Sequence, residues 1–308
     1  MGYRGRVNTS ASWGIAVLAL VLLGGCSGEA GPPATTGPRP TSTSPTTTSV
    51  VTTTVVATTT TGAPTTTTTT LPTGVTDPPE WLGTRVLPVR PDGLGEVQPT
   101  PPELVDRRFT SPDLLPPPPD DTFTATSTAV PEDVLARSTW SEECPVGVDD
   151  LRYLTATFWG FDGRVHTGEL LVNEQYADEI TTVLEAMFEA RFPIEEMRVI
   201  RTDELDLPPT GDGNVTTSFV CRPAVGSSNW SQHAYGLAID INPFHNPYIK
   251  GDLVIPELAS AYVDRTQVRP GMILAGDAVT GAFAAIGWRW GGEWNSLIDT
   301  MHFSASGT

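Results

Sequence analysis

Two histidines of this chain lie close in sequence to carboxylates, at spacings that suit a metal ion. His233 and Asp240 stand seven residues apart, with a turn glycine, Gly236, between them. From residue 237 onward the residues alternate with period two, as in a half-buried strand, which places Asp240 on rigid backbone. Because glycine lets the chain reverse, His233 can return to the side of the strand on which Asp240 lies. An imidazole and a carboxylate there would supply two of the three protein ligands of a catalytic zinc site.

A second pair lies near the end of the sequence. Asp299 and His302 are three residues apart, a spacing that suits one metal ligand and one acid–base group. A lone histidine is more often hydrogen-bonded in a core or on a surface than bound to a metal. The chain has only 4 histidines, however, and two of them stand in these segments. His166 and His245 stand in no such motif, and we interpret both as structural or surface residues.

Together, the two segments resemble the zinc peptidases of bacterial cell walls. That family contains the VanY-type D-alanyl-D-alanine carboxypeptidases and the L-alanyl-D-glutamate peptidases of phage endolysins. Its pattern is Ser-x-His-x-x-Gly-x-Ala-x-Asp, followed by Asp or Glu-x-x-His. The matching residues are Ser231, His233, Gly236, Ala238, Asp240, Asp299 and His302. The likeness extends over roughly residues 145–308, with one departure at Ser304, where many relatives carry an acidic residue that is not a ligand.

The resemblance implies a catalytic zinc centre. His233, Asp240 and His302 would bind Zn²⁺, and water would take the open fourth position. Asp299 would accept the proton of that water and pass it to the leaving amine. If Asp299 were only an exposed charge, Glu293 would be the one nearby substitute.

Other residues near the motifs are candidates for binding substrate. Arg222 stands where relatives carry a substrate-facing arginine, so it would pair with a substrate carboxylate or steady the oxyanion; a surface salt bridge is the alternative. Ser231 either donates a hydrogen bond to substrate or shapes its loop. Three tryptophans could wall the cleft, although core packing is the simpler expectation for at least two of them: Trp288, Trp290 and Trp294.

Several functions fit these motifs. We expect a zinc peptidase of the D-Ala-D-Ala carboxypeptidase kind that acts on peptidoglycan stem peptides. An L-Ala-D-Glu endopeptidase of the same family is one alternative. A non-catalytic wall-binding module is another, since the hedgehog signalling domain resembles this fold, but the presence of Asp299 argues against it. A calcium site is disfavoured because two of the ligands are imidazoles.

The first 25 residues have the features of a signal peptide. They contain two arginines, an apolar run over residues 14–23 and no acidic residue, and the run is too short to span a membrane. The run ends in Leu23-Gly24-Gly25-Cys26, which resembles a bacterial lipobox. We therefore expect an extracytoplasmic protein, lipid-anchored through Cys26 to the bacterial cell membrane. Ordinary secretion with a chance cysteine is the alternative.

Composition divides the chain into four parts. Residues 1–25 are the signal peptide, and residues 26–75 are a disordered tether. Threonine fills 20 of the 38 positions from 35 to 72, and such a segment cannot form a core. Residues 76–139 are proline-rich, and we expect them to be partly ordered; the resemblance implies that residues 140–308 form the zinc peptidase domain.

The charge of the chain limits its partners. The net charge of −18 excludes binding of nucleic acid or anionic lipid through charge. We expect a monomer. Besides Cys26 the chain has two cysteines, Cys144 and Cys221, which in an exported protein would form a disulfide. Two separate buried thiols are the alternative.

The expected domain mixes strands and helices. The patterns predict a hairpin of residues 151–158 and 164–172, strands at 196–200 and 218–222, and helices over 177–190 and from Asp277 to about Ile286. Because strands and helices do not alternate regularly, we expect an α+β domain built on a mainly antiparallel sheet with flanking helices. The resemblance implies the fold shared by hedgehog and D-Ala-D-Ala peptidases.

Overall fold

A long hairpin forms the largest sheet of this computed structural model, which describes residues 71–308. β2 (Leu151–Trp159) and β3 (Val165–Asn173) pair antiparallel along their whole length, which confirms the predicted hairpin. The amide of Gly160 donates to the carbonyl of Arg164 at 2.8 Å and closes the turn. β1 (Ala125–Thr128) pairs with the other edge of β2.

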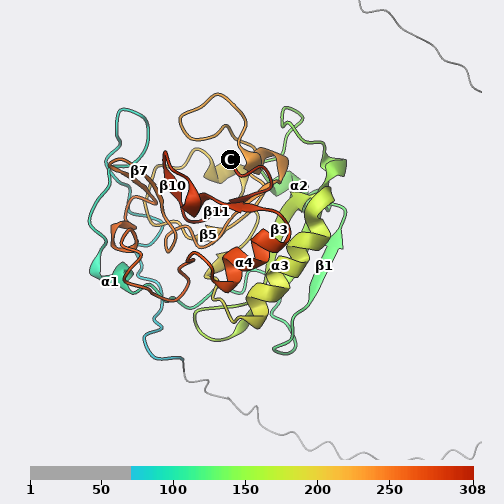
Figure 1. Cartoon of the computed structure of the whole chain (residues 1–308), viewed down its shortest axis with the longest axis horizontal. Helices are drawn as coiled ribbons and strands as arrows, with labels where there is room; N and C mark the ends of the chain where they lie inside the picture. The colour runs from blue at the N-terminus through green and yellow to red at the C-terminus, as the bar shows by residue number, and fades with distance from the viewer. Residues whose placement is uncertain (1–70) are drawn as a thin grey trace, which may run out of the picture. The chain divides into compact units, whose positions relative to one another are not determined.

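Two helices pack side by side next to this sheet (Figure 1). α3 (Ala177–Glu189) turns its apolar side chains toward β2, and α4 (Ala278–Ala285) packs against α3. Asp277 caps α4, because its Oδ1 accepts a hydrogen bond from the amide of Thr280 at 2.8 Å. The sequence predicts both helices to within about two residues. The core between these elements also contains side chains from two short strands, Ile239 and Phe303, and thereby fixes the backbone that carries the histidine motifs.

Three small sheets complete the body. The first has the order β6 (Ala238–Asp240), β11 (His302–Ser304), β9 (Arg289–Trp290), and the second has the order β10 (Ile298–Asp299), β7 (Tyr248–Lys250), β8 (Leu253–Ile255). The third contains β4 (Glu196–Met197) and β5 (Val215–Thr216). β4 and β5 are parallel, and every other strand pair within residues 71–308 is antiparallel. The architecture is therefore α+β with small, mainly antiparallel sheets.

Two of the predicted strands are shortened or lost. The strand predicted at 196–200 is reduced to β4, and residues 218–222 form no strand. The backbone of that second segment is nevertheless paired, since the amides of Phe219 and Val220 donate to the carbonyls of Leu171 and His233 at 3.1 and 3.2 Å. These two acceptors belong to different segments of the chain, so no regular ladder forms.

Residues 71–139 pack against the rest of this body, and the sequence predicts that residues 76–139 are partly ordered. Leu87, Leu104 and Phe109 are buried in one hydrophobic cluster with Phe244 and Tyr262. Besides β1 the segment forms only two short helices, α1 (Pro102–Val105) and α2 (Glu132–Arg137). Apolar residues spaced irregularly through proline-rich coil carry no periodicity, so the sequence pattern does not predict which surface of the domain they cover.

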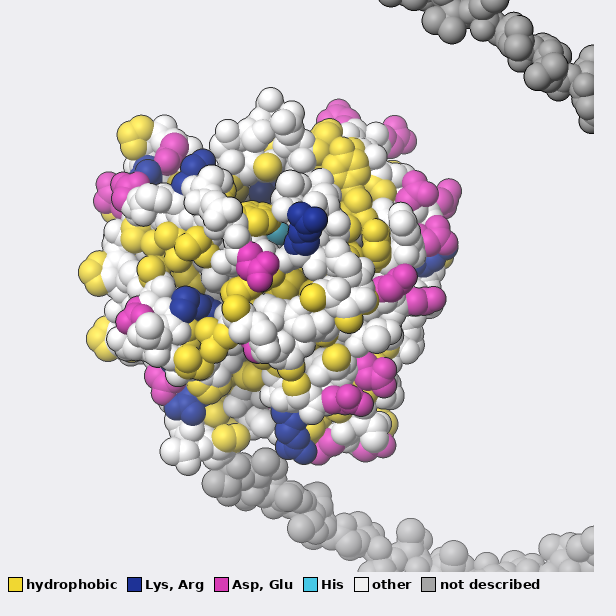
Figure 2. Space-filling model, in the orientation of Figure 1, with side chains coloured by type: hydrophobic (Ala, Val, Ile, Leu, Met, Phe, Trp, Pro, Cys, Tyr) yellow, Lys and Arg dark blue, Asp and Glu magenta, His cyan; other side chains and the backbone are white. Residues whose placement is uncertain are grey.

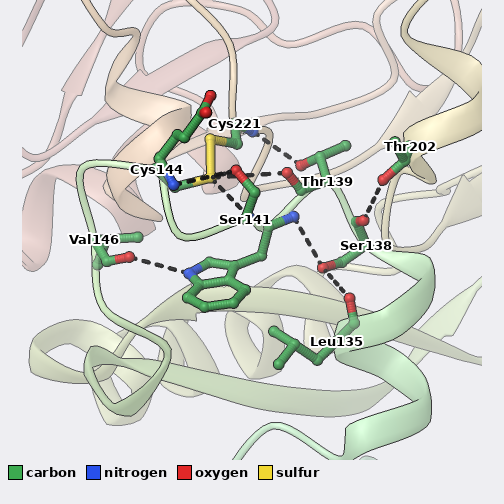
Figure 3. Close-up of a disulfide and its surroundings, with 10 residues drawn as sticks. Leu135, Ser138, Thr139, Ser141, Cys144, Val146, Thr202 and Cys221 are labelled. Carbon is green, nitrogen blue, oxygen red and sulfur yellow. Dashed lines mark hydrogen bonds between the residues drawn. A yellow bond between two sulfur atoms is a disulfide. The ribbon is translucent and has the colours of Figure 1, made fainter.

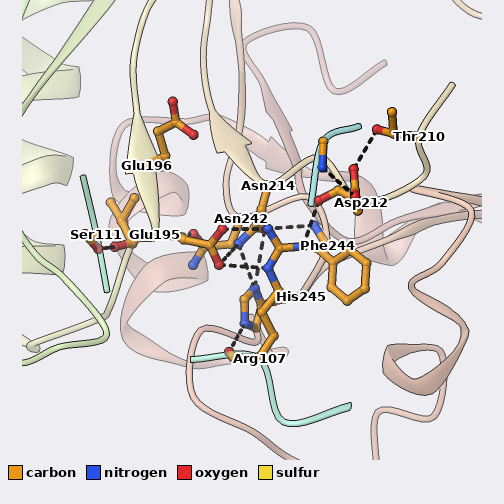
Figure 4. Close-up of polar contacts among 12 residues, drawn as sticks. Arg107, Ser111, Glu195, Glu196, Thr210, Asp212, Asn214, Asn242, Phe244 and His245 are labelled. Atoms are coloured by element: carbon orange, nitrogen blue, oxygen red, sulfur yellow. Dashed lines mark hydrogen bonds and ion pairs between the residues drawn. The ribbon is translucent and has the colours of Figure 1, made fainter. Parts of the chain in front are cut away.

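A buried ion pair also joins residues 71–139 to the rest of the body (Figure 4). Arg107, which is 2% exposed, donates from Nε and from its second terminal nitrogen to both carboxylate oxygens of Glu195, at 2.8 and 2.6 Å. The side-chain amide of Asn214 also donates to Glu195, at 2.9 Å. His245 Nε2 donates to the carbonyl of Arg107 at 2.8 Å, and burial lowers the pKa of His245 to about 4. His245 is therefore a neutral structural residue of this network.

A disulfide ties residues 139–146 to the segment before the first histidine motif (Figure 3). Cys144 and Cys221 are bonded, with their Cα atoms 5.8 Å apart. The amide of Cys221 also donates to the hydroxyl of Thr139 at 2.9 Å. Both contacts hold the backbone immediately before Arg222.

The predicted signal peptide (residues 1–25), Cys26 and the tether up to residue 70 lie outside the described residues. Among residues 71–308, no helix combines the length and the apolar character that a membrane crossing requires.

Candidate functional site

The first histidine motif is a one-turn helix held against the end of the hairpin. Ser231 caps the 3₁₀ helix Gln232–Tyr235, since its hydroxyl accepts a hydrogen bond from the amide of His233 at 3.3 Å. Gly236 ends the turn with φ of 67°, a left-handed conformation that favours glycine. A Cβ at this position would lie 2.7 Å from the amide nitrogen of Asn173, so glycine is also needed for the close approach to β3.

The register of β6 and β11 brings the two motifs together. Asp240 and His302 are directly opposite each other in this antiparallel pair, so their side chains share one face. Asp240 Oδ1 lies 3.0 Å from His302 Nδ1, and Asp240 Oδ2 lies 3.2 Å from His233 Nε2. One ligand atom from each of the three residues can be chosen so that all lie within 4.8 Å of one another. The structure thus assembles the three residues that the sequence predicts as metal ligands.

The hydrogen bond of the His233 ring to Ser218 favours a cation at this cluster. Its Nδ1 lies 2.5 Å from the carbonyl oxygen of Ser218, which can only accept, so Nδ1 carries a hydrogen. In the neutral ring, Nε2 then presents a lone pair to the Asp240 carboxylate, an arrangement that needs a proton or a metal ion between the two atoms. Burial opposes ionisation of Asp240, but the adjacent imidazoles of His233 and His302 hold the pKa of Asp240 well below its usual range.

The donor set fits zinc. Two imidazole nitrogens and one carboxylate oxygen are the ligands found at catalytic zinc sites, where a fourth position stays open. The carbonyl of Ser218 holds the His233 ring in the orientation that aims Nε2 at the cluster, as outer hydrogen bonds of zinc ligands do. His302 Nε2 is buried and has no hydrogen-bond partner within residues 71–308, so the polar contacts of this ring are incomplete in the protein alone.

Asp299 stands next to the cluster but outside the ligand set. Its Oδ1 is buried and has no hydrogen-bond partner in the described part of the chain. Burial raises the pKa of Asp299 to about 7, and the negative charge of Asp240 adds to the effect. A Cβ at Gly291 would come within 2.6 Å of the Asp299 carbonyl oxygen. Glycine at position 291 therefore allows the backbone of β10 to lie this close to residue 291. A divalent cation at the cluster would favour the ionised carboxylate, which could then accept a proton.

These side chains open into one cavity of about 320 Å³. Figure 2 shows the hollow on this face, with a histidine at its floor and basic and acidic side chains beside it. The chemical groups that line the cavity include His233, Asp240, Asp299, His302 and Arg222. Their combination of metal-binding, acid–base and cationic groups in one cleft is the arrangement that a hydrolase requires.

Residues 225–305 match the sequence model of a family described as D-alanyl-D-alanine carboxypeptidase. The match supports a peptidase. It contains both histidine motifs and Asp299, whereas Arg222 and all residues before 225 lie outside it. Neither the comparison with curated proteins nor the comparison with solved structures gave a match.

Arg222 and Ser231, the two residues predicted to bind the substrate, differ in how free they are to do so. Arg222 is half-buried, lines the cavity and contacts no carboxylate among the described residues; its side chain donates only to the carbonyl of Pro223, at 3.2 Å. Its positive charge acts on the Asp299 carboxylate across the cleft. Ser231 is 9% exposed and its hydroxyl already caps the His233 turn. Arg222 is therefore the better candidate for binding a peptidase substrate.

Of the remaining candidate residues, the three tryptophans and Glu293, only Trp294 lines the cavity. Trp294 lines the cavity, with its ring centroid 5.4 Å from that of His302. Trp288 is 3% exposed in the core, and Trp290 stacks on Phe303 and donates from Nε1 to the carbonyl of Thr300. Glu293 is exposed and does not line the cavity, so it is a poor substitute for Asp299.

Sequence reasoning missed Tyr248 and Trp230, which also line the cavity. Tyr248 is directly opposite Asp299 in the β7–β10 pair. Neither residue stands in a motif, and only the pairing of short strands far apart in sequence brings Tyr248 to the site. The one sequence signal for Trp230 was its position directly before Ser231 of the first histidine motif.

Proposed function

We propose that this protein is a zinc peptidase that hydrolyses peptidoglycan stem peptides in the manner of D-Ala-D-Ala carboxypeptidases. One observation carries the proposal: Asp299, whose buried Oδ1 has no hydrogen-bond partner within residues 71–308, stands in one cleft with the cluster of His233, Asp240 and His302. The family match over residues 225–305 contains all four residues and supports the substrate class. Consistent with that match, we propose that the fold is the one shared by hedgehog and D-Ala-D-Ala peptidases.

The proposed chemistry assigns a role to each residue. His233, Asp240 and His302 would hold the zinc ion, which lowers the pKa of the attacking water and polarises the scissile carbonyl. Asp299 accepts the proton from that water and later gives it to the leaving amine. Arg222 pairs with the free carboxylate of a terminal D-alanine, since a guanidinium binds a carboxylate through two parallel hydrogen bonds.

Digestion of purified peptidoglycan tests this proposal. We expect the full chain to remove the terminal D-alanine from pentapeptide stems, which mass spectrometry detects as shortened stems and free D-alanine. The matched control is Asp299→Asn, which keeps the shape of the side chain and loses the proton-accepting oxygen. New free amino groups on D-glutamate would instead identify an L-Ala-D-Glu endopeptidase. Unchanged stems with zinc bound would identify a non-catalytic wall-binding module and overturn the proposal.

We further propose that the protein is extracytoplasmic, monomeric and anchored through lipid on Cys26 to the bacterial cell membrane. The lipobox-like sequence that ends at Cys26 and the threonine-rich residues after it support this location. Cells that express Cys26→Ala should lose the membrane-bound form of the protein. An unchanged membrane fraction would contradict the anchor and leave the peptidase proposal intact.

A further inference from the structure

Tyr248 stands beside the proposed general base. It begins β7 and is directly opposite Asp299 of β10 in an antiparallel pair. Side chains of directly opposite residues project from the same face of the sheet, with Cβ atoms about 4.5–5.5 Å apart. Tyr248 and Asp299 both line the cavity that contains His233, Asp240 and His302. The phenol is thus next to the carboxylate that would act on the water.

The hydroxyl of Tyr248 is free within the described part of the chain. It has no hydrogen-bond partner in residues 71–308, whereas Tyr153 donates to Glu169 at 2.6 Å and the hydroxyl of Tyr262 accepts from the amide of Arg107 at 2.9 Å. Burial raises the pKa of Tyr248, and the negative charge of Asp299 adds to this. The phenol therefore keeps its proton at neutral pH and remains a hydrogen-bond donor.

We propose that Tyr248 is a catalytic residue, whose hydroxyl donates a hydrogen bond to the carbonyl oxygen of the scissile amide as that oxygen becomes negative. This inference rests on the proposed function. The water oxygen forms a bond to the carbonyl carbon and its proton goes to Asp299. The carbon–nitrogen bond then breaks as the amine takes a proton from Asp299. The phenolic proton stays on Tyr248 throughout.

A neutral donor suits this position better than a cation does. A second positive charge beside Asp299 would lower the pKa of the carboxyl and weaken it as a base, whereas a phenol adds no net charge. Arg222, which carries a permanent charge and a planar donor pair, is left for the substrate carboxylate. The two cavity residues then have separate roles, one in the transition state and one in substrate binding.

Kinetic comparison of Tyr248→Phe with the parent tests the inference on a stem pentapeptide. The variant should lose about 100-fold in kcat, the lower end of the loss typical of an oxyanion donor, with little change in KM because the bond forms mainly in the transition state. Zinc content and melting temperature should stay at the parent values. The matched control is Tyr176→Phe, which removes another hydroxyl without a partner in residues 71–308, at a residue outside the cavity. This control should match the parent.

A second measurement uses a phosphinate analogue of D-Ala-D-Ala, which resembles the tetrahedral transition state. Tyr248→Phe should bind the phosphinate about 100-fold more weakly than the parent, in step with the loss in kcat. A kcat within twofold of the parent, or a rise in KM alone, would overturn the role of Tyr248. A parent that binds zinc and cleaves no stem peptide would overturn the proposed function, and this inference with it.

Discussion

The Arg107 network and the cluster around His233 both bury charged side chains, but they differ in how completely their polar atoms are paired. In the network, Glu195 accepts three hydrogen bonds, two from Arg107 and one from Asn214. None of its side-chain atoms is among the buried polar atoms that lack a partner within residues 71–308. In and beside the cluster, by contrast, His302 Nε2 and Asp299 Oδ1 have no hydrogen-bond partner within residues 71–308.

This difference separates a structural site from a functional one. A buried polar atom without a partner destabilises a fold by about 1–3 kcal/mol, and use by a ligand or a reaction is one explanation for it. Other such atoms within residues 71–308, among them Arg265 Nε and Trp288 Nε1, lie away from the cluster, so what distinguishes the cavity is that two of them occur together in it. The Arg107 network needs nothing from outside and fixes residues 71–139 to the rest of the body. Under the proposed function, a cation and a substrate would complete the cluster around His233. The first two predictions below each change one region and measure the properties of both.

The largest expected effect follows from removing the proton acceptor. Asp299→Asn should lower peptidase activity by about 10²–10⁴-fold, the range typical of general acid–base catalysis. Zinc content and melting temperature should remain those of the parent, because three other side chains would hold the metal. Loss of zinc together with activity would make Asp299 a ligand. Survival of activity would mean that another base acts.

Breaking the Arg107 network should lower the stability of the fold and leave peptidase activity unchanged. Arg107→Met leaves the Glu195 carboxylate buried without its ion pair, and we expect the free energy of unfolding to fall by about 3–5 kcal/mol. Denaturant titration measures this loss. The folded fraction should still bind zinc and keep its kcat. The control is Asp203→Asn, which breaks the exposed pair with Arg201 and should leave the unfolding midpoint unchanged. Loss of zinc at an unchanged midpoint would contradict the separation of the two regions.

The smallest effect concerns His166, which lies in neither region and is fully buried between Asp113 and Asp162. Its Nδ1 lies 2.7 Å from Asp113 and its Nε2 lies 3.1 Å from Asp162. Burial alone would lower the pKa of His166, but hydrogen bonds and charge from both carboxylates outweigh it and raise the pKa. The charged imidazole therefore stabilises the fold at pH values below the unfolded pKa of about 6.5. This contribution is lost as pH rises through the higher native pKa.

Unfolding free energies of the parent and His166→Gln, measured across this pH range, test the titration of His166. The difference between the two proteins should be largest at acidic pH and should narrow as the pH rises. Zinc content and kcat should not differ at neutral pH, since His166 lies outside the cavity. A difference that stays constant with pH would show that the imidazole acts without its charge.

The cluster of His233, Asp240 and His302 could be predicted because each motif is local in sequence and the two motifs together resemble a known family, although Asp240 and His302 stand 62 residues apart. The period-two pattern after Gly236 and the three-residue spacing of Asp299 and His302 both survive in β6, β10 and β11. The hairpin and helix α3 were predictable for the same reason, since each has a regular apolar period.

Contacts between distant segments could not be predicted in this way. Tyr248 reaches the site only through the pairing of two short strands, and Arg107 meets Glu195 across 88 residues of chain. Residues 218–222 resemble a strand in composition, yet their backbone bonds go to different segments. Such pairings depend on tertiary packing, which overrides local preference.

Zinc binding by the full chain decides whether the cluster of His233, Asp240 and His302 is a metal centre. Titration of the metal-free parent with zinc, monitored by calorimetry, should give one zinc ion per chain. Metal analysis of the product should give the same ratio. His233→Ala, Asp240→Ala and His302→Ala should each lose the ion, and Asp299→Asn should keep it. A parent that binds no zinc, or three ligand variants that all retain one ion per chain, would contradict this metal centre.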